Sequence, residues 1–395
     1  MKNTAMALLW AAASAVCANP VISPDSVVLT QPKGGTIKVA YTLANEAAVV
    51  TVDFLTNGVS IGEVNFTNVV GDVNRKVEPG ERMITWRAYK TWPDHKIADA
   101  SFTARVTAWP LAKPPDYLVV DLTKTSDVLR YYVSSNAVPG GVLSDENKTS
   151  HLVMRKIHAS AQTFFHQIPI RNERRVSFTN DYYIGIFELT QGQYVSLGFP
   201  SRGSYTGVDR LKHPLETTSL IVLRGRYNWP EGGHADVTAD SFIGKLQALT
   251  LLAFDLPTET QWEFAARAGS MGHYFWGSGN ASEYAHVGYT AGKDLTFEVG
   301  LKRPSPWGLY DIHGNVLEHT LDRCVNNSSP DSIETLPKGH FFEPEGWPKS
   351  HSSCCTTKGG KAASSTVPAG QRNRVNASEG YYGNGFRLVC PALVP

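Results

Sequence analysis

Alternating apolar and polar residues fill the chain between residues 25 and 112, in short runs that Gly, Pro, Asn and Asp turns separate. Runs of this length and spacing predict strands, and several in succession are typical of an antiparallel β-sandwich of immunoglobulin type. This stretch has no cysteine for the buried disulfide of antibody domains, so the likeness is one of architecture. Such a domain serves as a binding module or as a spacer, and fold alone does not decide which. The predicted strands are 26–29, 36–41, 49–54, 82–86 and 102–109.

Two consecutive prolines, Pro114 and Pro115, interrupt this pattern and mark a domain boundary, because consecutive prolines favour an extended connector. Residues 113–150 are therefore predicted to be a linker, although a strand-like apolar run lies at 117–122. A larger domain is expected to begin at residue 151 and to extend to residue 392.

The larger domain combines strand and helix patterns and so predicts an α+β fold. Residues 182–190 have the character of a strand, and Thr190 is placed to cap a helix directly after it. Apolar positions at helical spacing along 240–250 indicate an amphipathic helix. The strongest helix signal spans 258–269, where a threonine cap precedes an acidic first turn and a glycine ends the helix.

The N-terminal residues 1–18 have the composition of a cleaved secretory signal. Lys2 supplies a positive start, an apolar run follows at 6–16, and small residues favour cleavage after Ala18. A lipoprotein anchor at Cys17 is the alternative, but the residues before Cys17 match that motif poorly. We therefore expect a secreted or periplasmic protein. No later stretch is apolar over the roughly 20 residues that a membrane span requires.

The bulk composition is that of a folded protein without a charge bias. Of 395 residues, 42% are hydrophobic and 18% are charged, which supports two or three domains with sizeable cores. Lys and Arg number 37 against 36 Asp and Glu, a formal net charge of +1. An extended nucleic-acid surface needs a clustered basic excess, so we expect no nucleic-acid partner.

The cysteines that remain without the signal all lie in the last quarter of the chain. An even number in an oxidising compartment favours disulfides, but the sequence does not separate the three alternative pairings. A tetrathiolate zinc site is disfavoured because two of the cysteines are adjacent, and adjacent cysteines can also join each other in a strained bridge. The disulfide candidates are Cys324, Cys354, Cys355 and Cys390.

Several separated motifs follow one another in the larger domain. They are 182–194 (YYIGIFELTQGQY), 256–269 (LPTETQWEFAARAG), 307–319 (WGLYDIHGNVLEH), 359–360 (GG) and 385–388 (GFRL). In this order the motifs resemble those of the sulfatase-modifying factor or formylglycine-generating enzyme family. The resemblance covers roughly residues 151–392 and implies a mixed domain with little regular secondary structure, related to C-type lectins.

The catalytic chemistry of this family depends on residues that this chain replaces. In its copper-dependent members, two cysteines after the double glycine hold copper(I), which activates oxygen to oxidise a sulfatase cysteine to formylglycine. The resemblance places these positions near Ser364 and Ala369. Because soft copper(I) prefers thiolates and a serine hydroxyl is a poor substitute, we expect no copper here. The nearest thiols, Cys354 and Cys355, precede the double glycine.

Two other kinds of metal site have candidate ligands in the sequence, one bound by histidines and one that holds calcium. His313 and His319 lack the H-x-x-x-H spacing by which a helix chelates a metal, so packing or surface roles are favoured. The resemblance implies a calcium site at the G-N-x-x-E segment, formed by Asn315, Glu318 and a carbonyl oxygen of Val316 or Leu317. Oxygen ligands of this kind suit calcium, although a turn Asn with a solvated Glu is an equally good interpretation.

Two further substitutions bear on the calcium expectation. Leu317 and His319 replace the tryptophans that flank this Glu in the family, and the second calcium site of the family would fall near His286. Both changes weaken the expectation of bound calcium.

The interpretation that follows is a secreted protein with a non-catalytic recognition or structural role, whose loops bind a glycan, a peptide or a partner protein. The alternative is an oxidoreductase that modifies a sulfatase cysteine through a divergent site, and a third option is an accessory subunit that binds substrate peptide without turnover. Aromatic residues in loops could stack on sugar faces, or simply pack the loops onto the domain. These candidates are Tyr227, Trp229, Trp347, Tyr381 and Tyr382.

Overall fold

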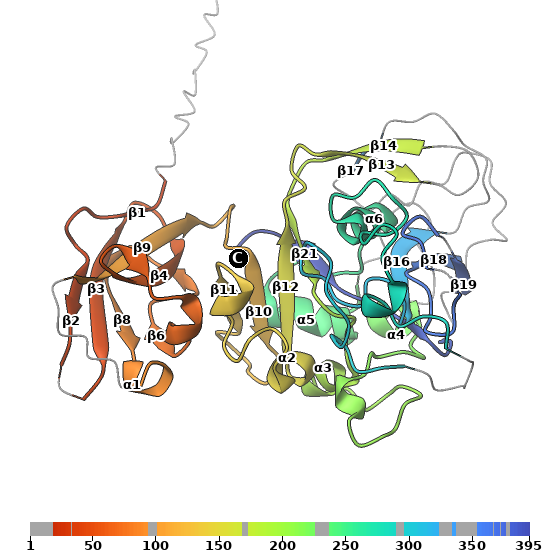
Figure 1. Ribbon diagram of the computed structural model, residues 1–395, viewed down its shortest axis with the longest axis horizontal. Coiled ribbons are helices and arrows are strands. Elements are labelled where there is room, and N and C mark those ends of the chain that lie inside the picture. Colours follow the sequence, from red (N-terminus) through yellow and green to blue (C-terminus); the bar gives the residue numbers. More distant parts are fainter. Residues whose placement is uncertain are drawn as a thin grey trace, which may run out of the picture.

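The computed structural model of the chain contains two regions of sheet that lie side by side (Figure 1). Residues 19–112 form the N-terminal β-domain, and residues 113–395 form the C-terminal domain. No helix among the residues that the structure describes is long and apolar enough to cross a membrane. The described residues are 19–395 without 33, 94–100, 168–172, 226–236, 290–295, 324–333, 337–353, 366, 372 and 377–379.

The N-terminal β-domain consists of two antiparallel sheets. All of the predicted strands are present. Most of them extend at least one residue beyond the predicted range. The short helices η1 (Glu63–Phe66) and α1 (Ala88–Thr91) lie in its connections. One sheet contains β1 (Val21–Ile22), β2 (Val28–Thr30), β3 (Ile37–Ala44), β6 (Val69–Gly71) and β8 (Gly80–Trp86), and the other contains β4 (Ala48–Thr56), β5 (Val59–Ser60), β7 (Lys76–Val77) and β9 (Phe102–Pro110).

The two sheets share one core, because alternate residues of a strand point to the same face. Phe54 of β4 stacks on Trp86 of β8 with ring centroids 4.5 Å apart, and Phe102 of β9 stacks on Phe54 at 5.9 Å. The immunoglobulin type of this arrangement stays a prediction.

The C-terminal domain is built on an antiparallel sheet in the order β11-β10-β12-β15-β21. Residues 113–150, predicted to be a linker, contribute two of its strands and the helix α2 (Asp145–Thr149), so that prediction was wrong. The physical reason is that β10 is paired on both sides and buries Leu118 and Val120 completely. The strands are β10 (Tyr117–Asp121), β11 (Leu129–Tyr132), β12 (His151–Ile157), β15 (Tyr182–Gly185) and β21 (Val389–Pro391).

The predicted helices of this domain are present with the predicted caps. Thr190 and Thr258 each form a capping box at the start of a helix, and Ser241 caps the amphipathic helix between them. The α-helices are α3 (Gln191–Ser196), α4 (Leu220–Arg224), α5 (Phe242–Thr250) and α6 (Glu259–Arg267), with short 3-10 turns η2 (Ser135–Ala137), η3 (Arg210–Lys212) and η4 (Ala281–Glu283).

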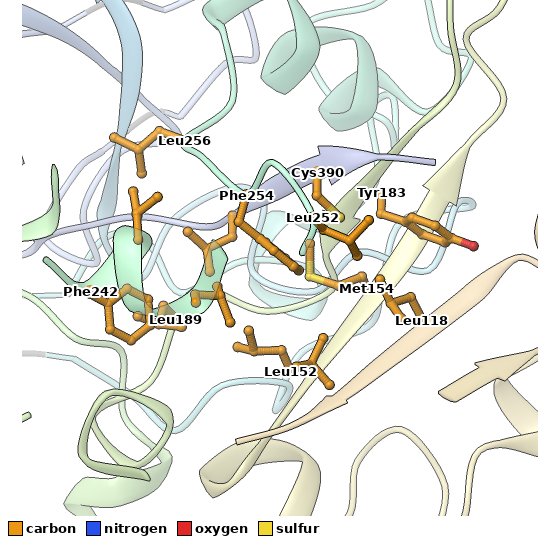
Figure 2. Packing of buried hydrophobic residues seen from close by; sticks show 14 of the residues in the cluster. Leu118, Leu152, Met154, Tyr183, Leu189, Phe242, Leu252, Phe254, Leu256 and Cys390 are labelled. Atoms are coloured by element: carbon orange, nitrogen blue, oxygen red, sulfur yellow. The ribbon is translucent and has the colours of Figure 1, made fainter. Parts of the chain in front are cut away.

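A large apolar core lies against one face of this sheet. Figure 2 shows Leu118, Met154 and Cys390 pointing into it beside Leu252 and Phe254. Cys390 has a free thiol and is only 2% exposed, so the disulfide predicted for this cysteine is not formed. Its position on β21 turns the sulfur into the core, where burial raises the thiol pKa.

The other predicted disulfide positions lie beyond what the structure describes. Cys324 and the side chains of Cys354 and Cys355 fall outside the described residues, so pairing among them stays a prediction.

Two smaller sheets complete the domain and bring the sequence motifs together. The sheet β19-β18-β16-β20 matters most, because β18 leads directly into the double glycine at 359–360. The strands are β16 (Leu317–Arg323), β18 (Cys354–Lys358), β19 (Asn373–Asn376) and β20 (Asn384–Gly385) in this sheet, and β13 (Thr163–Gln167), β14 (Glu173–Phe178) and β17 (Glu334–Leu336) in the third. The predicted α+β class, with mostly sheet and few helices, is confirmed.

Candidate functional site

The separated sequence motifs meet in a buried polar network. Glu318 of β16 accepts hydrogen bonds from Arg387 on both carboxylate oxygens, at 2.6 Å to Nη2 and 2.7 Å to Nε. The indole Nε1 of Trp262 on α6 donates to the same carboxylate at 2.7 Å. Both members of the ion pair are fully buried, so a neutral replacement of either would leave the other charge unpaired.

A second part of this network joins α6 to β18. The ammonium group of Lys358 lies 3.2 Å from Oε1 of Glu259 and 3.0 Å from Oε2 of Glu263. Arg267, one turn further along the helix, lies 2.8 Å from Oε1 of Glu263. The charged residues of the central helix motif are therefore used to hold α6 against the sheet.

The third part connects the first motif to the G-N-x-x-E segment. Glu188 accepts hydrogen bonds from Nδ2 of Asn315 at 2.7 Å and from the amide of Val316 at 3.1 Å. Burial, with Asp311 and Glu318 nearby, raises the pKa of Glu188 well above its usual range. Burial also raises the pKa of Asp311 to about 6. These motif residues form an internal scaffold.

This network tests the calcium site that the resemblance implied. Both carboxylate oxygens of Glu318 already accept from Arg387, and Oδ1 of Asn315 accepts from the amide of Phe297 at 2.9 Å. A divalent cation at Glu318 would also lie beside the Arg387 guanidinium. The donor set therefore does not fit calcium in this arrangement, because calcium needs several free oxygens directed at one point.

The positions of the family's copper cysteines lie in the loop after the double glycine and have structural contacts. The hydroxyl of Ser364 accepts a hydrogen bond from the amide of Lys361 at 3.0 Å, and its carbonyl oxygen accepts from Gly288 at 2.9 Å. Ala369 is buried, and its amide donates to the carbonyl oxygen of His273 at 2.9 Å. Neither residue offers a thiolate, the ligand that copper(I) prefers, and their equivalence to the family's copper cysteines stays a prediction from the resemblance.

Next to this loop an aromatic turn reaches the surface. Tyr381 is 40% exposed and Tyr382 is 56% exposed. The chain beneath them is fixed by Gly380, where a Cβ atom would lie 2.2 Å from the carbonyl oxygen of Thr217. We call residues 380–383 the tyrosine turn.

Charged residues under the tyrosine turn hold it in place. The ammonium group of Lys361 donates to the carbonyl oxygen of Tyr382 at 2.5 Å, and the buried carboxylate of Glu216 accepts from the amide of Gly383 at 3.2 Å. Burial lowers the pKa of Lys361, and the charge of Glu216 acts in the opposite direction. The surface aromatic pair therefore rests on a fixed base.

A buried amide lies directly after the tyrosine turn. Asn384 is 1% exposed, and neither its Oδ1 nor its Nδ2 has a hydrogen-bond partner among the described residues. A buried polar group without a partner is unfavourable, and such groups concentrate at functional sites. Asn384 thus marks this end of the β16–β20 pair as a candidate binding position.

The histidines of this region are buried and neutral. Burial lowers the pKa of His313 to about 4, and its Nδ1 donates to the carbonyl oxygen of Val367 at 2.6 Å. Burial likewise lowers the pKa of His286 and of His319 to about 4. Within the described residues no group of three or more His, Cys, Asp and Glu is arranged to hold a metal ion.

The predicted ligand-binding aromatics divide into two sets. Tyr381 and Tyr382 lie together on the surface, whereas Tyr227, Trp229 and Trp347 fall outside the described residues.

The residues that support the tyrosine turn were not predicted. The sequence offered one signal for Lys361, namely its position directly after the double glycine motif. Glu216 and Asn384 belong to irregular segments without a periodic pattern, and only the folded chain places them under the turn.

Solved structures of several proteins resemble part of the chain. Treponema denticola variable protein 1 is 25% identical, with a TM-score of 0.44 over 61% of this chain and 95% of that protein. PvdO from Pseudomonas aeruginosa is 19% identical, with a TM-score of 0.45 over 61% of this chain and 94% of PvdO. CarF is 16% identical, with a TM-score of 0.42 over 60% of this chain and 98% of CarF. No curated protein matches the chain.

The family comparison covers most of the chain. The model of the sulfatase-modifying factor enzyme 1-like domain matches residues 137–392, which begins within the segment predicted to be a linker. The residues that form the buried network all lie inside this match. The chain therefore belongs to the family of the sulfatase-modifying factor enzyme 1-like domain.

Proposed function

We propose that this protein is an exported, non-catalytic member of its family, which uses the tyrosine turn to bind a glycan, a peptide or a partner protein. The observation that carries the proposal is that the two positions assigned to the copper cysteines have structural roles. Ser364 closes a turn through its hydroxyl, and Ala369 is buried in the scaffold, so both positions serve the fold.

The tyrosine turn has the properties of a recognition element. Its two phenol rings present apolar faces with a polar tip, which suits stacking on sugar rings and hydrogen bonding to their hydroxyls. Lys361 and Glu216 fix the backbone beneath the rings, so little conformational freedom is lost when a ligand binds. Export is supported by the signal-like residues 1–18.

Binding is tested with a panel of immobilised oligosaccharides and the mature protein. The variant Y381A/Y382A should lose at least about tenfold in affinity for any sugar that binds, because each stacked ring contributes on the order of 1 kcal/mol. The matched control is Y89A, since Tyr89 is a 53% exposed tyrosine of the N-terminal β-domain. Equal loss in both variants, or no loss in either, would contradict the proposal.

The rival function is oxidation of a sulfatase cysteine through a divergent site. It is tested by incubating the protein with copper(I), oxygen and a peptide that carries the C-x-P-x-R motif. We expect the peptide to keep its mass and its thiol. A formylglycine product would replace the non-catalytic proposal, whereas capture of the unchanged peptide would indicate the accessory-subunit role.

A further inference from the structure

A pocket of about 400 Å³ lies on the face of the main sheet that is opposite the large apolar core. It is lined by alternate residues of β10, Val119 and Asp121, while Leu118 and Val120 point into the core on the other side. Volumes of this size are typical of small-molecule sites. Val138, in the loop that follows β11, also lines the pocket.

The pocket is separate from the tyrosine turn. In Figure 1, β10 and β11 lie next to the N-terminal β-domain, whereas β16, β18 and β19 lie on the far side of the C-terminal domain. Arg75 of the N-terminal β-domain approaches the pocket's rim, with Nη1 3.6 Å from Oδ2 of Asp127. The pocket therefore lies near the junction of the two domains, a common location for small-molecule sites.

The floor of the pocket consists of buried apolar side chains. Val119, Tyr132 and Val138 line it, and all are buried members of one hydrophobic cluster. An apolar floor of this kind favours a ligand with a hydrophobic side chain.

The rim of the pocket contains charges of both signs. The carboxylate of Asp121 lies 2.8 Å from the ammonium group of Lys124, and Arg130 makes a two-pronged pair with Asp127. Burial acts to raise the pKa of Asp121, but hydrogen bonds from Lys124 and Thr123 outweigh it and lower the pKa to about 2. Asp121 is therefore a carboxylate at any physiological pH.

The pair between Asp121 and Lys124 is easily opened. The side chain of Lys124 is 55% exposed, and surface pairs of this kind contribute little to stability. A ligand ammonium group can take the place of Lys124 at Asp121, and the released lysine can then pair with a ligand carboxylate. The neighbouring guanidinium of Arg130, opposite Val119 on β11, adds a second positive group.

We propose that this pocket binds a small zwitterion, namely an amino acid or a short peptide with free termini. The ligand's ammonium group pairs with Asp121, its carboxylate pairs with Lys124, and its apolar side chain lies on the floor of Val119, Tyr132 and Val138. A zwitterion matches this lining better than a polyanion, because the carboxylates of Asp121, Asp127 and Glu146 lie beside the positive groups of Lys124 and Arg130.

The proposal is tested by calorimetric titration of the full mature protein with the dipeptide leucyl-leucine. Three analogues are titrated beside it, one acetylated at the N-terminus, one amidated at the C-terminus and one blocked at both ends. We expect the free dipeptide to bind and each single block to weaken binding at least tenfold. No binding of the free dipeptide, or equal binding of the doubly blocked form, overturns the proposal.

Variants separate the two ends of the ligand. D121N should lower the affinity for the free dipeptide at least tenfold. K124Q should also lower the affinity for the free dipeptide but leave the affinity for the amidated form unchanged. Lys124 is exposed, so K124Q carries the test even if D121N fails to fold. R303Q, on a 68% exposed arginine elsewhere, is the matched control. A loss with R303Q equal to that with K124Q, or an unchanged affinity in K124Q, overturns the assignment of the carboxylate contact.

Discussion

At the scale of single residues, burial decides which groups of this protein are charged. His286, His313 and His319 are all buried and remain neutral down to a pH of about 4, although an isolated histidine has a pKa near 6.5. Asp311 shows the same effect with the opposite sign, because burial raises its pKa to about 6. These groups respond to pH through stability, since none of them is accessible to solvent.

The neutral histidines predict a loss of stability in acid. Between pH 6.5 and about 4 the unfolded chain binds protons at each histidine that the folded chain does not, so the free energy of unfolding falls as the pH falls. His313 alone contributes roughly 3 kcal/mol over this range. The buried acids Asp311 and Glu188 act in the opposite direction, because burial raises the pKa of both, so a single variant is needed to isolate the contribution of one histidine.

This effect is measured by urea unfolding at several pH values. H313Q should reduce the pH dependence of the free energy of unfolding by about the contribution of one histidine. H273Q, which replaces an exposed histidine, should leave this pH dependence unchanged. A pH dependence in H313Q equal to that of the wild type would contradict the assignment.

Cys390 gives a second prediction at this scale. Because its thiol is free, buried and held in the protonated form, it should not react with iodoacetamide in the folded protein and should react once urea unfolds the chain. Mass spectrometry of the peptide that contains Cys390 measures this directly. Recovery of Cys390 in a disulfide-linked peptide would contradict the structure at this position.

At the scale of elements, α6 and β16 are joined by polar contacts that the sequence motifs supply. Trp262 and Arg387 both donate to Glu318, whose carboxylate is fully buried. The motif residues thus act between elements that are far apart in the chain.

Removing one partner of this network should be costly. E318A leaves the guanidinium of Arg387 buried without its carboxylate, and we expect a loss of roughly 3–5 kcal/mol in the free energy of unfolding. The double variant E318L/R387M should recover much of that loss, because the unpaired charge is removed with its partner. Urea unfolding measures both, and a loss below about 1 kcal/mol in E318A would show that the pair is not essential.

At the scale of the whole molecule, the two domains share a core. Val49 of β4 belongs to the apolar cluster of the C-terminal domain, and Trp109 and Leu111 pack against the same cluster. Lys76 donates to the carbonyl oxygen of Pro395 at 2.8 Å across the junction. We therefore expect the domains to support each other's stability.

Truncation tests this coupling. A chain that begins at residue 113 loses these contacts, so its melting temperature should lie several degrees below that of the full chain, which should unfold in one calorimetric transition. Two separate transitions in the full chain, the upper one matching the truncated chain, would show that the domains are independent.

Local patterns were sufficient to predict the elements but not their partners. The longer strands of the N-terminal β-domain and the caps at Thr190 and Thr258 follow from periodicity and capping chemistry within a few residues. The short strands β1, β5, β6 and β7 were not predicted. The segment 117–122 was assigned to a linker because its strand pairing depends on β12, more than 25 residues away in the chain. The prediction of a disulfide at Cys390 was wrong, because an even count of cysteines carries no information on which of them are buried away from a partner.

The candidate site was predictable only in part. The family resemblance assigned Ser364 and Ala369 to the copper positions, and that assignment stays a prediction, although both residues have structural contacts. Glu318 was assigned to calcium because its pairing with Arg387, on a distant segment, cannot be read from spacing.

The buried network at Glu318 has a consequence for how activities are inherited across the family. In this chain the motif residues that define the family match cross-link the interior, so a stable fold requires them whether or not the protein has a catalytic function. A match to these motifs consequently identifies a shared framework and leaves the activity to be determined by experiment.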